Sequence, residues 1–135
     1  MGKRILVVDD DPTSLKLLDL ILNKEGYQVM TASNGLEALR KARLEAPDLL
    51  ILDVMLPGFD GFEICHRLRT EPATATMPIM MLSSKQQKSD QDAASKVGAN
   101  AFLAKPVDRT ALLTKVAELL GDQKPPEPEP KPNAT

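Results

Sequence analysis

Two stretches of the sequence, the interior of "DLLILD" at residues 48–53 and "PIMML" at residues 78–82, are apolar without interruption. A strand with one face in water alternates apolar and polar residues, so an uninterrupted apolar run fits a strand that is covered on both faces. Strands of that kind belong to parallel sheets with helices packed above and below. These two runs therefore point to a layered fold around a parallel sheet.

Three further short apolar runs lie along the chain: "RILVV" at 4–8, "YQVMTA" at 27–32 and "AFLA" at 101–104. Between the five runs, apolar residues recur three and four positions apart, which is the spacing of an amphipathic helix. Strands that alternate with such helices are joined by right-handed crossovers. The sequence therefore predicts an α/β fold, a doubly wound layer of five parallel strands and five helices.

Capping residues mark where two of these helices should begin. Asp11 is expected to cap the first helix, with Pro12 at its first position and Gly26 at its end. The second helix is expected to begin after Ser33 or Asn34. Both helices have one apolar face, so they should lie on the surface of the sheet.

Composition limits the classes of function. The 135 residues include 17 Lys+Arg and 19 Asp+Glu, with a net charge of -2, so we expect no direct nucleic-acid contact and no basic membrane patch. No apolar run approaches the roughly 18 residues of a spanning helix, and the first one is too short for a signal peptide. The single cysteine, Cys65, fits a reducing compartment and a place in the core. We therefore expect a cytoplasmic protein.

The character of the sequence changes after Asp122. Residues 123–135, "QKPPEPEPKPNAT", are rich in proline and contain no large aliphatic side chain. Such a segment cannot pack into a core and favours extended polyproline II. We therefore assign residues 1–122 to one domain and residues 123–135 to a Pro-rich tail or linker, with recognition by a proline-binding groove as the alternative.

Polar residues follow the expected strands at the point where each strand ends. These residues are Asp9 and Asp10 after the first strand, Asp53 after the third, Ser83 and Ser84 after the fourth, and Lys105 after the fifth. In open parallel sheets, functional groups gather outside the carboxyl ends of the strands. Three carboxylates, a hydroxyl and an ammonium are therefore expected to converge on one cleft.

Three carboxylates in one cleft repel one another. Two like charges about 5 Å apart repel by roughly 3 kcal/mol at an effective dielectric constant near 20. A divalent cation removes this repulsion, and oxygen ligands without His or Cys favour a hard ion such as Mg²⁺. A solvated turn is the alternative for Asp9 and Asp10, whereas Asp11 caps a helix. A carboxylate opposite a metal, flanked by a lysine and a hydroxyl, is also equipped to accept a phosphoryl group.

The motifs "VVDDD", "LLILDVMLPGFDG", "MLSS" and "AFLAKP" occur in this order. From Arg4 to about Leu120 the chain resembles the receiver domain of bacterial two-component response regulators, and it is similar to the chemotaxis response regulator. The resemblance implies the flavodoxin-like strand order 2-1-3-4-5. It also implies a signalling switch of a phosphorelay, phosphorylated by a sensor histidine kinase or a phosphotransfer domain. Such a switch catalyses only its own phosphorylation and dephosphorylation and is not a conventional enzyme.

The resemblance assigns the acceptor and the metal site. Asp53 would be the aspartate that receives the phosphoryl group. Asp9 and Asp10 would be the acidic pair, and Asp10, Asp53 and the backbone carbonyl of Met55 would bind Mg²⁺ directly. The side chain of Met55 would not matter for that role.

The resemblance also assigns the switch. Lys105, followed by the cis proline Pro106, would bind the phosphoryl oxygens. Ser83, in place of the usual threonine, would move toward the phosphoryl group and let Phe102 turn inward. This change would remodel the face made by the fourth helix, the fifth strand and the fifth helix, where a downstream protein or effector domain would bind. Phe102 lacks the hydroxyl of a tyrosine, so an output that needs that hydroxyl is not expected.

Two further positions bear on the phosphoryl lifetime. In receiver domains, the residues two beyond the acceptor and two beyond the switch hydroxyl flank the path of the attacking water, and here they are Met55 and Lys85. A thioether is a weak hydrogen-bond acceptor and cannot orient a water well, whereas the Lys85 ammonium could pair with phosphoryl oxygens. We therefore expect slow self-dephosphorylation. The alternative is that both side chains point into solvent.

Other functions fit parts of the pattern. Asp53 or Ser83, taken singly, could cap a turn or a helix. A phosphohydrolase that forms an aspartyl phosphate is a second candidate, although the chain has adjacent aspartates after the first strand and "DVM" at Asp53 where those enzymes have a DxD motif. A third candidate is the amino-terminal regulatory half of a larger DNA-binding or enzymatic response regulator.

Overall fold

The computed structural model describes residues 2–84 and 88–121 of the chain. Its strands form one parallel sheet in the order β2-β1-β3-β4-β5. The strands are β1 (Arg4–Val8), β2 (Gln28–Ala32), β3 (Leu49–Asp53), β4 (Ile79–Ser83) and β5 (Ala101–Ala104). The helices are α1 (Pro12–Lys24), α2 (Gly35–Glu45), α3 (Gly61–Arg69), α4 (Lys88–Lys96) and α5 (Arg109–Leu120). The predicted fold class and strand order are confirmed.

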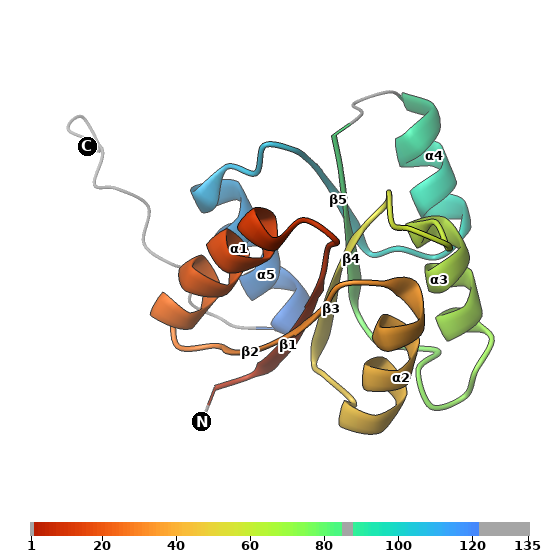
Figure 1. Cartoon of the computed structure of the whole chain (residues 1–135), viewed down its shortest axis with the longest axis horizontal. Helices are drawn as coiled ribbons and strands as arrows, with labels where there is room; N and C mark the ends of the chain where they lie inside the picture. The colour runs from red at the N-terminus through yellow and green to blue at the C-terminus, as the bar shows by residue number, and fades with distance from the viewer. Residues whose placement is uncertain (1, 85–87, 122–135) are drawn as a thin grey trace.

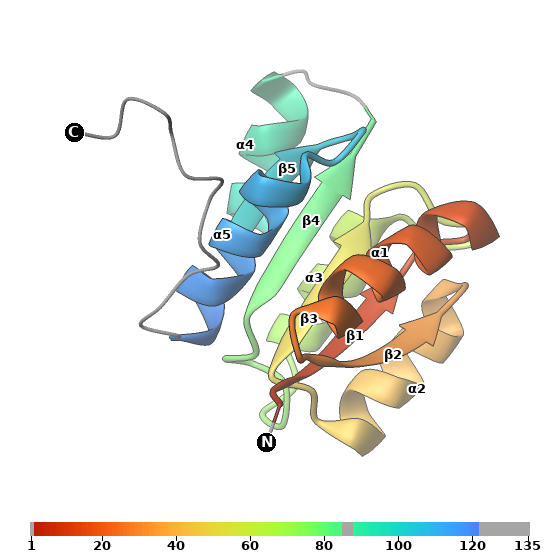
Figure 2. The same cartoon turned by 90° about the vertical axis from the view of Figure 1, so that its left-hand side faces the viewer.

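The sheet is the middle one of three layers. Helices α1 and α5 cover one face, and α2, α3 and α4 cover the other (Figures 1 and 2). Successive residues of each strand point to opposite faces, so Ile5 packs in the cluster with α1 and α5, whereas Leu6 packs in the cluster with α2, α3 and α4. The molecule therefore has two hydrophobic clusters on opposite sides of the sheet.

The two uninterrupted apolar runs form the centre of the sheet. All five residues of β3 and all five of β4 are buried, and each of these strands has a neighbour on both sides. The edge strands β2 and β5 are mostly half-buried. Coverage on both faces was the property predicted from these two runs, and it is confirmed.

The helix starts follow their capping residues. The Asp11 carboxylate accepts a hydrogen bond from the Thr13 amide at 3.3 Å, and the Asn34 side chain accepts one from the Glu37 amide at 2.9 Å. The predicted cap of α1 is confirmed, and Asn34 is the cap of the two offered for α2. The second strand begins at Gln28, one residue later than predicted, because the preceding amide still bonds back to the end of α1.

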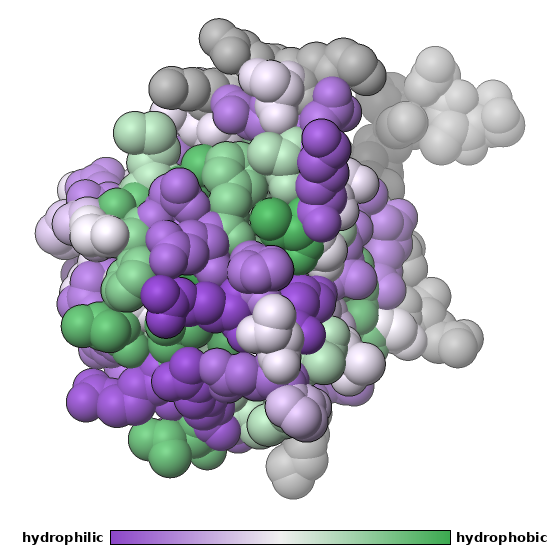
Figure 3. Space-filling model, turned by 90° about the vertical axis from the view of Figure 1, so that its right-hand side faces the viewer, coloured by the Kyte–Doolittle hydropathy of each residue, from purple (hydrophilic) through white to green (hydrophobic). Residues whose placement is uncertain are grey.

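Polar and charged residues cover most of the outside of the helical layers. On the side that carries α2, α3 and α4, polar residues separate smaller apolar patches (Figure 3). Leu36 and Leu44 are exposed on the outer face of α2. Cys65 is buried in α3, as expected, and His66 beside it is exposed. Among the described helices, none has the length and apolar character that a bilayer crossing requires.

Two predictions fall outside the described residues. They concern Lys85 and the Pro-rich segment at residues 123–135. Both stay predictions.

Candidate functional site

The carboxyl ends of the strands open on one cleft, as the sequence predicted. Asp9 and Asp10 follow β1, Asp53 is the last residue of β3, and Lys105 follows β5, and all four line this cleft. The loop between β3 and α3 supplies another part of the wall, including Met55. The strand order accounts for this convergence, because β1 and β3 are neighbours and the Lys105 amide donates to the Ser83 carbonyl at the end of β4, at 2.7 Å.

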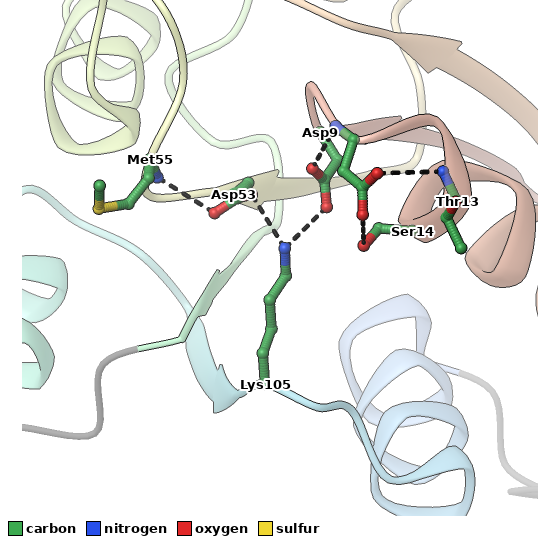
Figure 4. A network of polar contacts seen from close by, with 7 residues as sticks. Asp9, Thr13, Ser14, Asp53, Met55 and Lys105 are labelled. Carbon is green, nitrogen blue, oxygen red and sulfur yellow. Dashed lines mark hydrogen bonds and ion pairs between the residues drawn. The ribbon is translucent and has the colours of Figure 1, made fainter.

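Lys105 joins the two most buried carboxylates. Its Nζ lies 2.8 Å from Asp9 Oδ2 and 2.9 Å from Asp53 Oδ2 (Figure 4). The side chain of Asp9 is 1% exposed and that of Asp53 is 8% exposed. Lys105 follows β5, two strands away from β3 and three from β1, so its side chain reaches across the cleft. One ammonium therefore serves two carboxylates that belong to different strands.

The second oxygen of each buried carboxylate is held by a backbone amide. Asp9 Oδ1 accepts a hydrogen bond from the Asp11 amide at 2.9 Å. Asp53 Oδ1 accepts one from the Met55 amide at 3.1 Å. Both oxygens of Asp9 and of Asp53 thus have a donor, which fixes the orientation of the two carboxylates. The geometry also distinguishes Asp10, whose side chain is exposed at the mouth of the cleft.

Burial and neighbouring charges have opposite effects on the pKa values of Asp53 and Lys105. Burial raises the pKa of Asp53 above its ordinary value, and it outweighs the Lys105 ammonium and the Met55 amide, which lower that pKa. Burial alone would lower the pKa of Lys105, but its contacts with Asp9 and Asp53 outweigh burial and raise it. Lys105 therefore stays charged, while a further positive charge in the cleft would favour the ionised form of Asp53.

The three carboxylates are close enough to share a cation. One oxygen from each of Asp9, Asp10 and Asp53 lies within 4.8 Å of the others. The described side chains at this point offer oxygen ligands and no His or Cys, which suits a hard divalent ion such as Mg²⁺. The donor set therefore fits the magnesium that the sequence led us to expect.

The remaining predicted positions lie around this centre. Ser83 is fully buried at the end of β4, and the neighbouring Ser84 lines the cleft. Phe102 is half-buried in β5 and packs against the cluster on the α2–α3–α4 side. Met55 lines the cleft and is 54% exposed. The Lys105–Pro106 peptide bond is cis, as the resemblance implied.

A close backbone contact beneath Asp53 was not predicted. Gly61, the first residue of α3, packs so tightly on the end of β3 that an added Cβ would lie 2.5 Å from the Asp53 carbonyl oxygen and 2.9 Å from Val54 Cα. The Gly61 amide also donates to the Val54 carbonyl at 2.6 Å. In the sequence Gly61 only follows Asp60, the residue that caps α3, and a glycine after a capping aspartate does not reveal which backbone it will touch.

An apolar groove adjoins the acidic cleft. It lies between α1 and the loop after β5, and its apolar walls include Leu17, Ile21, Pro106 and Val107. Ser14, Ser84 and Lys105 line both the groove and the acidic cleft. The groove therefore opens directly beside Asp53 and Lys105.

The family model described as the response regulator receiver domain matches residues 5–117. The chain belongs to this family. Receiver domains are the phosphorylation-accepting switches of two-component signalling and are not enzymes in the ordinary sense. The prediction from the four motifs is thereby confirmed.

Two curated relatives show the range of proteins that carry this receiver domain. The chain is 42% identical to the alkaline phosphatase synthesis transcriptional regulatory protein PhoP of Bacillus subtilis over 120 residues, which is 89% of the chain and 49% of PhoP. It is 37% identical to protein PilH of Pseudomonas aeruginosa over 117 residues, which is 87% of the chain and 97% of PilH. The chain thus spans about half of the first protein and nearly all of the second.

Solved structures agree with the fold. A CheY-like receiver domain protein from Methanospirillum hungatei is 32% identical, with a TM-score of 0.84 over 91% of the chain and 97% of that protein. The receiver domain of the sensor histidine kinase PA1611 from Pseudomonas aeruginosa is 28% identical, with a TM-score of 0.83 over 90% of the chain and 99% of that domain. That structure has a magnesium ion coordinated in its active-site cleft. Receiver domains bind Mg²⁺ at an acidic pocket, and this receiver domain has such a pocket.

Proposed function

We propose that this receiver domain accepts a phosphoryl group on Asp53, from a histidine kinase or a phosphotransfer protein. The observation that carries the proposal is the Lys105 ammonium, which lies within hydrogen-bond distance of both Asp53 and Asp9. This contact brings the positive charge of Lys105 beside Asp53, the last residue of the central strand β3. A phosphoryl group on Asp53 would bring its oxygens to this ammonium.

The transfer itself follows from the arrangement of the chain's own residues. One Asp53 carboxylate oxygen attacks phosphorus while the P–N bond of the donor phosphohistidine breaks. The donor nitrogen keeps the bonding electron pair and takes up a proton. Lys105 then donates to the phosphoryl oxygens and keeps its contact with Asp9, so its charge remains balanced.

The metal site has a supporting part in this proposal. Asp9, Asp10 and Asp53, together with the backbone carbonyl of Met55, would hold Mg²⁺. When bound, the ion supplies positive charge beside the phosphoryl oxygens. Asp9 already shares Lys105, so the exposed carboxylate of Asp10 is the one with most freedom to turn toward the ion.

The switch would run from Ser83 to Phe102. Ser83 would move toward the phosphoryl group, and Phe102 would turn inward from its half-buried position. Because Phe102 packs beside the α2–α3–α4 layer, this movement would change the face made by α4, β5 and α5. A downstream protein or effector domain would read the change on that face.

The phosphodonor protein would rest on the apolar groove beside the cleft. The groove and the cleft share Ser14, Ser84 and Lys105, so a partner seated on Leu17 would reach Asp53 directly. Leu17→Glu should therefore slow transfer from a protein donor and leave uptake from acetyl phosphate unchanged.

We place this phosphoryl transfer in the cytoplasm. The free, buried thiol of Cys65 is consistent with that reducing compartment.

A second candidate function is the regulatory half of a larger regulator. The relatives favour it in part, because the chain covers 49% of PhoP and 26% of the response regulator PleD of Caulobacter vibrioides. Residues 123–135 would then be a linker after a receiver domain at residues 1–122. The gene sequence beyond Thr135 decides between this arrangement and a receiver that acts alone.

The decisive experiment detects a covalently bound phosphoryl group by mass. Incubation with acetyl phosphate and Mg²⁺ should add the mass of one phosphoryl group, and Asp53→Asn or chelation should abolish it. Asp60→Asn is the matched control, because Asp60 lines the same cleft and asparagine preserves its capping of α3. A phosphoryl mass that persists in the Asp53 variant contradicts the acceptor assignment.

The lifetime of the acyl phosphate tests Met55 and Lys85. We expect slow loss of phosphate, and Met55→Asn and Lys85→Glu should accelerate it, most of all in combination. An asparagine amide can both donate to and accept from a water, which a thioether does poorly. Equal decay rates in all four proteins, followed after removal of the phosphodonor, would refute the expectation.

A further inference from the structure

Met55 differs from the other described methionines in its exposure. Those others are Met30, Met77, Met80 and Met81. Met80 and Met81 are fully buried and Met77 is 8% exposed, whereas Met55 is 54% exposed. Met30 is half-buried, and its sulfur accepts a hydrogen bond from Arg4 Nη2 at 3.5 Å. Met55 is therefore the methionine residue most exposed to a dissolved oxidant within residues 2–84 and 88–121.

Met55 also lies beside the reacting carboxylate. Its backbone amide holds Asp53 Oδ1 at 3.1 Å, and its residue lines the cleft that Asp53 and Lys105 share. The thioether leaves the backbone on the side away from the Asp53–Lys105 contact (Figure 4). The sulfur thus stands at the open side of the cleft and takes no part in holding Asp53, so its chemistry can change while that contact is kept.

We propose that Met55 is an oxidation site that shortens the life of the phosphorylated state, an inference that rests on the proposed phosphorylation of Asp53. A sulfur lone pair attacks one oxygen of hydrogen peroxide and the O–O bond breaks. The departing hydroxide takes up the remaining peroxide proton and leaves as water. Sulfur is oxidised by two electrons, the peroxide is reduced, and the product is methionine sulfoxide.

Oxidation to the sulfoxide makes the cleft wall more polar at Met55. Its oxygen is a strong hydrogen-bond acceptor with a partial negative charge, whereas the thioether is a weak acceptor. The new oxygen can accept a hydrogen bond from a water that enters at the open side of the cleft and attacks the acyl phosphate. This hydrogen bond speeds the loss of phosphate. A single neutral hydrogen bond to the attacking water corresponds to about fivefold in rate.

The first arm of the test needs no phosphorylation. The full chain is treated with hydrogen peroxide at increasing concentration, and its peptides are analysed by mass spectrometry. Met55 should gain one oxygen at least about tenfold faster than Met77, Met80 and Met81, because oxidation follows exposure. Equal rates at all of these methionines would overturn the proposal.

The second arm measures the phosphoryl lifetime. Oxidised and unoxidised chains are phosphorylated with acetyl phosphate and Mg²⁺, the donor is removed, and decay is followed by intact mass. Oxidation should accelerate decay about fivefold, and methionine sulfoxide reductase should restore the slow rate. In Met55→Leu, peroxide should not change the decay rate, whatever that rate is, which controls for oxidation elsewhere.

The outcomes separate this inference from the proposed function. Failure of the unoxidised chain to take up a phosphoryl group contradicts the acceptor assignment and, with it, the effect on lifetime. Normal uptake with equal decay before and after oxidation overturns the Met55 proposal alone. A peroxide effect that persists in Met55→Leu also overturns it, because the sensitive residue then lies elsewhere.

Discussion

Removal of the Lys105 charge should strongly destabilise the domain. In Lys105→Met, a side chain of similar length fills the same space without an ammonium, so Asp9 and Asp53 lose their shared partner. Their carboxylates remain almost fully buried and within 4.8 Å of each other. At that separation, and with an effective dielectric constant of about 20, two charges repel by about 3.5 kcal/mol. We expect the free energy of unfolding at neutral pH to fall by about 3–5 kcal/mol, the usual cost of breaking a buried pair.

Two further variants isolate the electrostatic part of this loss. Asp53→Asn in the Lys105→Met background removes one of the two unpaired charges, so the double variant should be more stable than Lys105→Met alone. Lys115→Met is the matched control, because Lys115 pairs with Glu118 on the exposed side of α5 at 3.3 Å. An exposed pair of this kind contributes about 0–1 kcal/mol.

The assay is urea unfolding followed by far-UV circular dichroism without added Mg²⁺. The chain has no Trp and one Tyr, so the backbone signal is the better probe. The reasoning is refuted if Lys105→Met loses no more stability than Lys115→Met. It is also refuted if the double variant is less stable than Lys105→Met, since the loss would then come from packing and not from charge.

Three other outcomes follow from the structure. A Mg²⁺ concentration about tenfold above its dissociation constant should stabilise the domain by about 1.4 kcal/mol and raise its melting temperature by about 5 °C, and Asp10→Asn should weaken this shift in a thermal scan. Gly61→Ala should lower the urea midpoint and slow phosphoryl uptake, because its Cβ would collide with the backbone of Asp53; an unchanged midpoint would contradict this. The pKa of Glu37 is lowered, and the hydrogen bond from the Ser33 amide is the largest cause. Glu37 should therefore stabilise α2 at neutral pH and lose that effect as the pH falls through its lowered pKa. The stability difference from Glu37→Gln should therefore shrink in acid, as urea unfolding at several pH values would show.

The sequence was most informative where burial alone determines structure. The run at residues 4–8 became β1 with the predicted bounds, and four of its five residues are buried. The run at residues 101–104 also became a strand with the predicted bounds, although its residues at the edge of the sheet are only half-buried. The fourth helix was harder to delimit, since its sequence is mostly polar and its only fully buried described residue is the small Ala94. A helix with so narrow an apolar face gives a weak periodic signal.

The chemistry of the cleft was predictable by residue type but not by contact. Strand ends placed Asp9, Asp53 and Lys105 at one edge of the sheet, which is a consequence of parallel topology. The sequence does not reveal that Lys105 holds both carboxylates. This contact depends on how far a side chain after β5 reaches across two other strands. The Gly61 contact beneath Asp53 depends in the same way on the spacing between α3 and β3.

The separation of the core into two clusters has a consequence for the way such domains diversify. Neighbouring positions of one strand, such as Ile51 and Leu52, pack on opposite sides of the sheet. A substitution at one of them is therefore compensated by partners on its own side only. The layer with α1, which borders the apolar groove, and the layer with α4 can accumulate changes independently after gene duplication. Because α5 shares the layer of α1, only the α4 part of the proposed downstream face is separated from changes beside the groove, provided that the strand ends between the layers stay as they are.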